Sequence, residues 1–149
     1  MTVVPARKTT VDAGGDSDRY EGTLSAIALP GHLMERASAG TYAPAGTAAV
    51  KYGALFAMEN EIYGKGTDSA YASGDNVLMI AKDAGDLVNV RVAAAAGAIV
   101  IGDPLVSAGD GTLRKAANAA ERAVALGFAE EACDNSGNAT VAWCTMRVA

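Results

Sequence analysis

The side chains best suited to chemistry in this sequence are two cysteines, one histidine and a few groups of carboxylates. Cys133 and Cys144 flank the turn-forming stretch DNSGNA, and His32 is the single histidine. A closed tetrahedral metal site needs four ligands, which two cysteines and one histidine do not supply. No serine lies in a GxSxG motif, so the sequence nominates no Ser/His/Asp or Cys/His site. We therefore expect no metal and no enzymatic activity, with His32 in a surface loop.

The two cysteines are predicted to be free and buried. A hairpin turn centred near Ser136 would place Cys133 opposite position 139 or 140, and Cys144 opposite about position 128. The two sulfur atoms would then be too far out of register for an undistorted disulfide. Buried free cysteines behave as small hydrophobic side chains. They are typical of a chain that is made and folded in a reducing cytoplasm.

The carboxylates do not form a pattern with an assigned chemistry. Asp12, Asp16 and Asp18 lie in DAGGDSD, which lacks the spacing of an EF-hand calcium loop. Glu59 and Glu61 would share one face of a strand, and without a pocket beside them they are expected to be solubilising charges.

A long glycine-rich stretch, AGDLVNVRVAAAAGAIVIGDPLVSAGDGTLRKA, spans Ala84 to Ala116 and contains Gly-Asp three times. A phosphate cradle needs a strand, a glycine-rich turn and a helix, whereas Asp103 and Asp110 here would repel a phosphate. Lys82 precedes GDPL at the distance that separates the modified lysine from the GDxL turn in lipoyl and biotinyl domains. Its context, AKD, is neither DKA nor MKM, so no cofactor is expected and such a carrier is only an alternative.

Composition and charge exclude two classes of partner. The net charge is −5 and the Lys and Arg residues are scattered, whereas a nucleic-acid-binding protein shows a basic stripe. No run approaches 18 apolar residues, so no membrane span is expected. Half of the residues are apolar but only 5% are aromatic, which gives a core of small side chains. Oligomerisation would add to the stability of such a core.

Short apolar runs alternate with Gly, Pro, Asn and Asp from Thr23 onward, which is typical of strands. We predict a mostly β, small single-domain barrel or sandwich with an extended N-terminal arm and at most one short helix. The predicted strands are TLSAIAL, TAAVKYGALFAM, NVLMIAK, LVNVRVAAAA, AIVI, LVSA, AVALGFA and VAWCTMRV.

Local patterns refine this prediction at three places. Val88, Val90 and Val92 alternate with Asn89 and Arg91, which predicts a strand with its valines inward. Asp110-Gly111 in SAGDGTLRKA predicts a tight hairpin turn. Ala117 to Arg122 is expected to form a short helix capped by Asn118, followed by a strand with Val124, Leu126 and Phe128 on one face.

Residues 1–22 have no sustained period and are predicted to be a flexible arm, with the β-rich domain at 23–149. Pro5 prevents the arm from being a central strand. Such an arm can order on binding, and its candidate partner-binding residues are Val3, Val4, Pro5, Arg7 and Tyr20. We expect a chain lacking residues 2–20 to fold but to bind its partner less tightly.

From about Tyr52 to the end, the order of features resembles the capsid decoration (cement) proteins of tailed bacteriophages. The matching pieces are YGALFAMENE, the stretch from Gly74 to Ala116, and AVALGFAEEACDNSGNATVAWCTMRVA. The resemblance covers roughly two thirds of the chain and rests on order and composition, without an invariant motif.

The resemblance implies a structural virion protein made in the host cytoplasm that binds the outer surface of the assembled capsid and bridges neighbouring major capsid proteins. It further implies a homotrimer without an active site, and an N-terminal arm that reaches a neighbour. An alternative is another β-rich virion module that binds a tail or a host surface. Ala93 to Ala96 are expected to lie where a strand or a subunit approaches closely.

Overall fold

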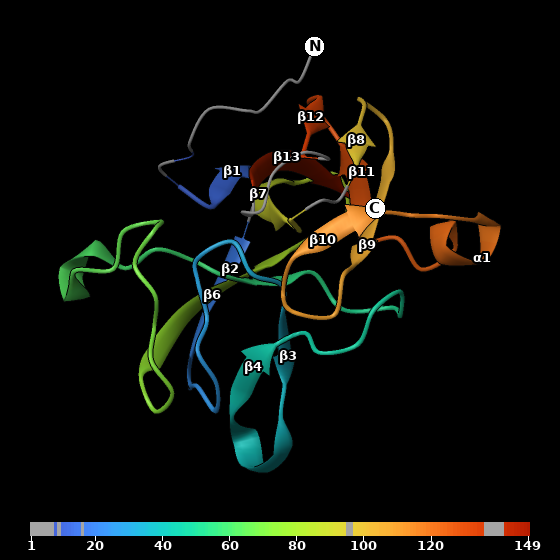
Figure 1. Cartoon of the computed structure of the whole chain (residues 1–149). Helices are drawn as coiled ribbons and strands as arrows, with labels where there is room; N and C mark the ends of the chain where they lie inside the picture. The colour runs from blue at the N-terminus through green and yellow to red at the C-terminus, as the bar shows by residue number, and fades with distance from the viewer. Residues whose placement is uncertain (1–7, 9, 16, 95–96, 136–141) are drawn as a thin grey trace.

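The computed structural model describes residues 8, 10–15, 17–94, 97–135 and 142–149 of the chain (Figure 1). The described part is mostly β, as the sequence predicts. Its strands are β1 (Asp12–Gly14), β2 (Ser17–Thr23), β3 (Met34–Arg36), β4 (Tyr42–Pro44), β5 (Leu55–Ala57), β6 (Asn76–Lys82), β7 (Leu87–Val92), β8 (Ala98–Ile99), β9 (Pro104–Ser107), β10 (Leu113–Lys115), β11 (Gly127–Ala129), β12 (Cys133–Asp134) and β13 (Ala142–Val148).

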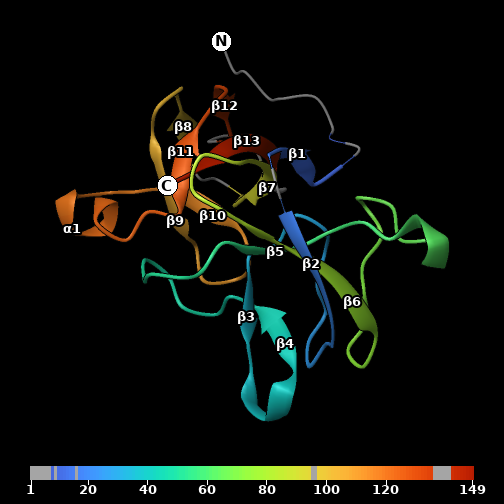
Figure 2. The ribbon, with the colours of Figure 1, turned by 180° about the vertical axis from the view of Figure 1, so that it is seen from behind.

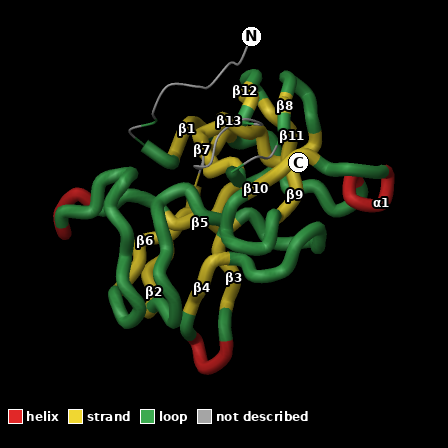
Figure 3. Tube along the Cα trace, in the orientation of Figure 1, coloured by secondary structure: helices red, strands yellow, loops and turns green. Residues whose placement is uncertain are grey.

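The helical segments are short and lie at separate points of the periphery (Figure 3). They are the 3₁₀ turns η1 (Ser38–Gly40) and η2 (Glu61–Tyr63) and the single α-helix of the described part, α1 (Ala119–Arg122). No helix in the described ranges is long and apolar enough to span a membrane.

Five strands close into a barrel. They follow one another in the order β7, β10, β9, β11 and β13, and β13 pairs again with β7. The closing pair is antiparallel and long, running from Val92 opposite Ala142 to Leu87 opposite Arg147. Closure leaves the barrel strands without an open edge. The main apolar cluster fills the barrel and includes Val88, Val90, Val92, Leu105 and Met146.

Strand β7 confirms the predicted inward stripe, because Val88, Val90 and Val92 are all 0% exposed. Its other face is buried as well, since Asn89 and Arg91 are each only 6% exposed. Alternation between apolar and polar residues therefore marks two different environments here rather than a core face and a solvent face.

The side chain of the buried Arg91 connects the barrel to the loops that cover the barrel. Its Nε donates to the carbonyl of Pro30 at 2.7 Å, and its guanidinium lies 4.4 Å from the Trp143 ring centre. Gly31 has a φ of +88°, and a Cβ at this position would meet the Trp143 ring at 2.5 Å. The loop can therefore approach the tryptophan only with glycine at position 31.

A second, three-stranded sheet has the order β2, β6, β5 and is antiparallel throughout. In Figures 1 and 2 it lies below the barrel, with the β3–β4 hairpin at the lower end of the molecule. A separate apolar cluster packs between this sheet and the neighbouring loops, with Leu24, Met34, Tyr71, Val77 and Met79 among its members.

The predicted hairpin and helix are both confirmed. β9 and β10 pair antiparallel, and Gly111 in their turn has a φ of +86°. Asn118 caps α1, because its Oδ1 accepts from the Glu121 backbone N–H at 3.0 Å. Both are local features, which explains why the chain sequence alone indicates them.

Several predicted strands are shorter than expected or missing. After Thr23, which ends β2, TLSAIAL forms only isolated bridges at Leu24 and Ala28, and the run from Thr47 to Met58 is a strand only over Leu55–Ala57. In the run after the helix, Leu126 is buried and Phe128 is 45% exposed, so the prediction of a shared face is wrong. The strand begins only at Gly127, and the chain before it is a turn after α1.

The predicted arm boundary at residue 22 requires correction. β1 pairs with β7, and β2 pairs with β6 along its whole length from Ser17 to Thr23. β2 is exposed and most of its residues are polar, so its sequence shows no alternation of apolar residues. The prediction relied on such alternation and therefore did not identify this strand. Deleting residues 2–20 would therefore remove parts of two sheets, so such a chain is expected not to fold.

Both cysteines are free and buried, as predicted. Their predicted register is wrong, because Cys133 pairs with Ile99 and Cys144 with Val90, while Phe128 lies opposite Arg147. Burial raises the pKa of Cys144 to about 12 and also raises the pKa of Cys133. Neither sulfur is therefore a reactive thiolate at neutral pH.

Candidate functional site

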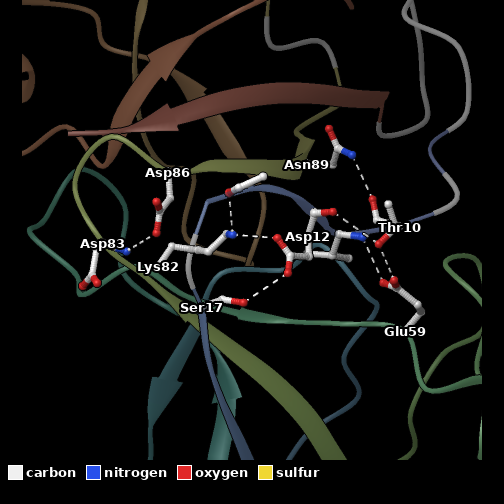
Figure 4. A network of polar contacts seen from close by, with 10 residues as sticks. Thr10, Asp12, Ser17, Glu59, Lys82, Asp83, Asp86 and Asn89 are labelled. Carbon is white, nitrogen blue, oxygen red and sulfur yellow. Dashed lines mark hydrogen bonds and ion pairs between the residues drawn. The ribbon is translucent and has the colours of Figure 1, made fainter.

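A polar network fixes residues 10–14 onto the two sheets (Figure 4). Lys82 Nζ donates to Asp12 Oδ1 at 2.7 Å and to the Gly14 carbonyl at 2.9 Å, and Ser17 donates to the other carboxylate oxygen. Burial alone would raise the pKa of Asp12, but the hydrogen bonds from Lys82 and Ser17 outweigh it and lower the pKa. Asp12 is therefore an ionised anchor.

Glu59 and Asn89 hold the next residues toward the N-terminus. The Glu59 carboxylate accepts from the Thr10 hydroxyl at 2.6 Å and from the Val11 N–H at 2.9 Å. The Asn89 side-chain amide donates to the Thr10 carbonyl at 2.9 Å. The prediction that Glu59 is only a solubilising charge is wrong, because its carboxylate binds backbone and side chain of the N-terminal segment.

Lys8 marks the point at which this anchored segment begins. Its Nζ lies 3.0 Å from Glu131 Oε1, and its carbonyl accepts from the Thr67 hydroxyl at 2.8 Å. Glu131 in turn accepts from the Thr145 N–H of β13 at 2.8 Å. Lys8 and residues 10–14 are thus tied to the two sheets.

The predicted partner-binding residues fall into two groups. Val3, Val4, Pro5 and Arg7 lie outside the described residues. Tyr20 belongs to β2 rather than to an arm, and it is 48% exposed. The structure therefore retains Tyr20 as a candidate surface residue but places it in a sheet.

Sequence reasoning missed three exposed apolar side chains on the β8–β9 turn and on β11. Val100 is 55%, Ile101 69% and Phe128 45% exposed. The turn that carries Val100 and Ile101 joins β11 through a hydrogen bond from the Gly102 N–H to the Ala129 carbonyl. AIVI was predicted to be a strand throughout, whereas β8 ends at Ile99 and the next two residues protrude.

Lys82 cannot serve as the attachment site of a carrier domain. Its side chain is 0% exposed and is bound to Asp12, whereas attachment requires a lysine at an exposed hairpin tip. The carrier alternative is therefore wrong. The distance in sequence between Lys82 and a GDxL turn does not indicate whether the lysine is buried. The packing of β1 against β6 and β7 decides this.

His32 is not a freely exposed loop residue. Its Nδ1 accepts from the Leu29 N–H at 3.1 Å, and a Cβ on Gly111 would lie 3.0 Å from its ring. Burial, together with the charge of Arg91, lowers the pKa of His32 to about 4. His32 is therefore neutral at pH 7 and holds a turn between the two sheets.

A shallow pocket of about 380 Å³ is lined by Tyr63, Lys65, Tyr71, Asp75 and Asn76. Its main polar groups already bind protein atoms: Lys65 donates to the Ala70 carbonyl, Tyr71 to the Met58 carbonyl, and Asp75 accepts from Ala72. Within the described ranges no group of three His, Cys, Asp or Glu side chains is arranged to hold a metal.

Of the four alanines predicted to admit a close neighbour, Ala95 and Ala96 lie outside the described residues. Ala93 donates its N–H to the Leu113 carbonyl at 2.9 Å, so β10 of the same chain is the neighbour there. Ala94 is exposed.

Comparison with known proteins identifies a shared fold. No family model matches the chain, and no curated protein matches it. Among solved structures, the head fiber gp8.5 N base in bacteriophage phi29 superposes with a TM-score of 0.60 at 12% sequence identity. The match covers 90% of this chain and 95% of that chain, so the two share the fold over nearly their whole lengths.

Proposed function

We propose that this protein is a structural component of a bacteriophage virion that attaches to the head. The observation that carries the proposal is the fold, which matches the base of a phage head fiber over 90% of the chain. The order of sequence features points independently to capsid decoration proteins. These two arguments use different information, since one rests on backbone geometry and the other on sequence.

Within that role, we propose that the protein binds the outer surface of the assembled capsid and cements neighbouring major capsid proteins. The anchored Lys8 supports this idea, because it gives the residues before it a fixed starting point from which Val3, Val4, Pro5 and Arg7 can contact a neighbour. The exposed Val100, Ile101 and Phe128 offer an apolar surface on the domain itself. Exposed apolar surface is typical of interaction sites.

The role is proposed to be structural rather than enzymatic. Every buried side-chain nitrogen and oxygen of the described part has a hydrogen-bond partner within the protein. The histidine, the buried lysine and the two cysteines each serve packing or hydrogen bonding. These groups therefore have a structural use that needs no substrate.

Co-sedimentation with capsids tests the proposal. Purified protein is mixed with expanded capsids that lack it, and the pellet is analysed for stoichiometric, saturable binding. We expect binding to expanded capsids and none to an unrelated capsid of similar size. Absence of the protein from the pellet would overturn the proposed role.

A shorter deletion tests the arm. Removing residues 2–7 leaves the anchored segment from Lys8 onward intact, so the variant should keep its thermal unfolding transition while its capsid affinity falls. A matched variant with residues 2–7 replaced by Gly and Ser separates chain length from side-chain contacts. Unchanged capsid affinity in both variants would contradict the role of Val3, Val4, Pro5 and Arg7.

The proposed homotrimer is tested by the mass of the protein in solution and on the capsid. A core of small residues buries little area per side chain, and association adds buried surface. A mass of three chains in solution would support a preformed trimer. A capsid-bound stoichiometry that is not a multiple of three would contradict the trimer.

A further inference from the structure

β2 is a seven-residue strand that pairs on one side only. It is the end strand in the order β2, β6, β5, and no other described strand lies on its second side. Asp18, Arg19, Tyr20 and Glu21 are all exposed. An open edge of this length is a template for another strand.

The backbone groups that face outward can be assigned from the neighbouring pair of strands. Met58 N–H donates to the Leu78 carbonyl and Lys82 N–H donates to the Ala54 carbonyl, so the even residues of β6 face β5. The odd residues Val77, Met79 and Ala81 therefore face β2, where they lie opposite Gly22, Tyr20 and Asp18. By alternation, the N–H and C=O groups of Ser17, Arg19, Glu21 and Thr23 point to the open side.

The open edge has a defined end. Beyond Thr23, the Ser25 N–H donates outward to the Tyr42 carbonyl at 2.9 Å, so β4 closes the edge there. Within the described residues, no backbone hydrogen bond outside the β2–β6 pairing reaches Arg19 or Glu21. The parallel bridge between Leu24 and Tyr42 also engages the Thr23 carbonyl, so the free groups lie from Ser17 to Glu21.

We propose that β2 pairs antiparallel with β2 of a second copy of this chain, about a twofold axis through Tyr20. Outward-facing odd residues lie opposite each other only when the axis passes through a residue, and an axis at 19, 20 or 21 keeps the two strands well overlapped. Charge selects among these three registers. An axis at 19 places Arg19 opposite Arg19, and an axis at 21 places Glu21 opposite Glu21.

Only the axis at Tyr20 pairs Arg19 of each copy with Glu21 of the other. Opposite charges directly across a strand pair are stabilising, and like charges there are destabilising. The same register places Ser17 opposite Thr23 and sets the two Tyr20 rings side by side at the centre. The two three-stranded sheets then become one continuous sheet of β5, β6, β2 and their counterparts.

This contact is independent of the proposed attachment to a capsid, since it uses only the protein itself. It is also separate from the proposed trimer. A trimer formed through another face would carry three such edges, and the β2 contact would link neighbouring trimers.

Disulfide trapping tests the register. In Tyr20→Cys the two Cα atoms would lie about 4.5 Å apart, as in a pair without direct hydrogen bonds, which is within the range of a disulfide. With oxidised glutathione, two thiols form one disulfide, and the glutathione disulfide takes up the two electrons and two protons as two molecules of reduced glutathione. The native Cys133 and Cys144 are buried and are present in every variant, so the parent protein gives the background rate of dimer formation.

We expect Tyr20→Cys to form covalent dimers at least about tenfold faster than Tyr63→Cys, whose position is 71% exposed but lies on η2. Arg19→Cys should be as slow as Tyr63→Cys, because position 19 faces position 21 in the proposed register. Equal rates at positions 20 and 63 would overturn the contact. Faster trapping at position 19 than at 20 would overturn the register.

Charge exchange tests the same contact without an added thiol. Arg19→Glu and Glu21→Arg should each weaken self-association by about tenfold, measured by sedimentation velocity, because each creates two like-charge pairs. The double variant Arg19→Glu/Glu21→Arg restores both opposite pairs and should return to within about threefold of the parent. A monomeric parent at all concentrations, or a double variant as weak as the singles, would overturn the proposal.

Circular dichroism of all variants checks that the exposed substitutions leave the fold unchanged. These experiments use purified protein alone, so they are separate from capsid co-sedimentation. A parent protein that shows no β2 pairing but still binds capsids would refute this contact and leave the proposed function standing.

Discussion

The barrel and the three-stranded sheet of β2, β6 and β5 manage their strand edges in opposite ways. In the barrel, the pairing of β13 with β7 leaves no open edge, and its core valines are completely buried. In the sheet, β2 has one open edge lined by charged residues. A closed barrel is stable by itself, whereas an open sheet depends on what holds and covers it.

The two regions are also held by different forces. The barrel relies on a contiguous apolar cluster. The sheet is joined to the barrel and to the N-terminal segment by polar side chains, with Lys82 and Asp12 at the centre. Perturbing each kind of contact separately tells us how far the two regions unfold together.

Val90→Asp should have the largest effect, because it buries an unpaired carboxylate in the barrel at a position that is 0% exposed. We expect loss of the cooperative unfolding transition in circular dichroism. Val100→Asp is the matched control, since Val100 is 55% exposed, and its transition should be unchanged. A folded Val90→Asp protein would show that the barrel core is not where the structure places it.

Lys82→Met should have the next largest effect, because it leaves Asp12 and the Gly14 carbonyl without their cation. Breaking a buried ion pair costs about 3 kcal/mol or more, and we expect about 3 kcal/mol since the Asp12 side chain is 26% exposed. Chemical denaturation measures this loss.

The matched control is Lys115→Met, whose partner is Asp103 and whose side chain is 42% exposed. We expect a loss of at most about 1 kcal/mol there. Equal losses in the two variants would show that burial of the Lys82 pair contributes nothing to the junction of sheet and barrel.

The junction should also be sensitive to acid through His32, which contacts both regions. Its pKa is about 4 in the folded protein against 6.5 in the unfolded chain, so only the unfolded chain gains a proton as the pH falls below 6.5. His32 therefore stabilises the fold above pH 6.5, and this stability is lost as the pH falls from 6.5 toward 4. Between pH 7 and pH 5 the loss should be about 2 kcal/mol.

Comparison with His32→Asn isolates this effect from the titration of carboxylates. Asparagine keeps an acceptor for the Leu29 N–H but does not titrate in this range. Denaturation at pH 7 and pH 5 should show a smaller decrease for the variant than for the parent. Identical decreases would mean that protonation of His32 is not coupled to unfolding.

Asn118→Ala should have the smallest effect, because it removes one cap from a short exposed helix at the edge of the barrel. Loss of the hydrogen bond to the Glu121 N–H should cost about 1 kcal/mol in the free energy of unfolding. Asn118→Asp keeps an acceptor and should be nearly neutral. If Asn118→Ala lost more free energy of unfolding than Lys82→Met, peripheral contacts would stabilise the fold more than the contacts between sheet and barrel.

Features that depend on neighbouring residues were predicted well. The inward valines of β7, the Asp-Gly turn between β9 and β10, and the Asn118 cap each follow from spacing or from the conformation of one residue. The mostly β class follows from the density of turn-forming residues. The surface candidates were predicted less well, since Tyr20 alone lies in the described part, and Val100, Ile101 and Phe128 were not anticipated.

The sequence by itself determined the β class, the local turns and the free cysteines, because these depend on short-range geometry and on residue chemistry. Only the tertiary structure decided that Lys82, Asn89 and Arg91 are buried, since their partners lie between 24 and 79 residues away in the chain. It also decided that residues 12–14 and 17–23 are strands, because their pairing partners are in β7 and β6. Long-range pairing supplies the hydrogen bonds that a polar segment cannot supply alone, and no local pattern records it.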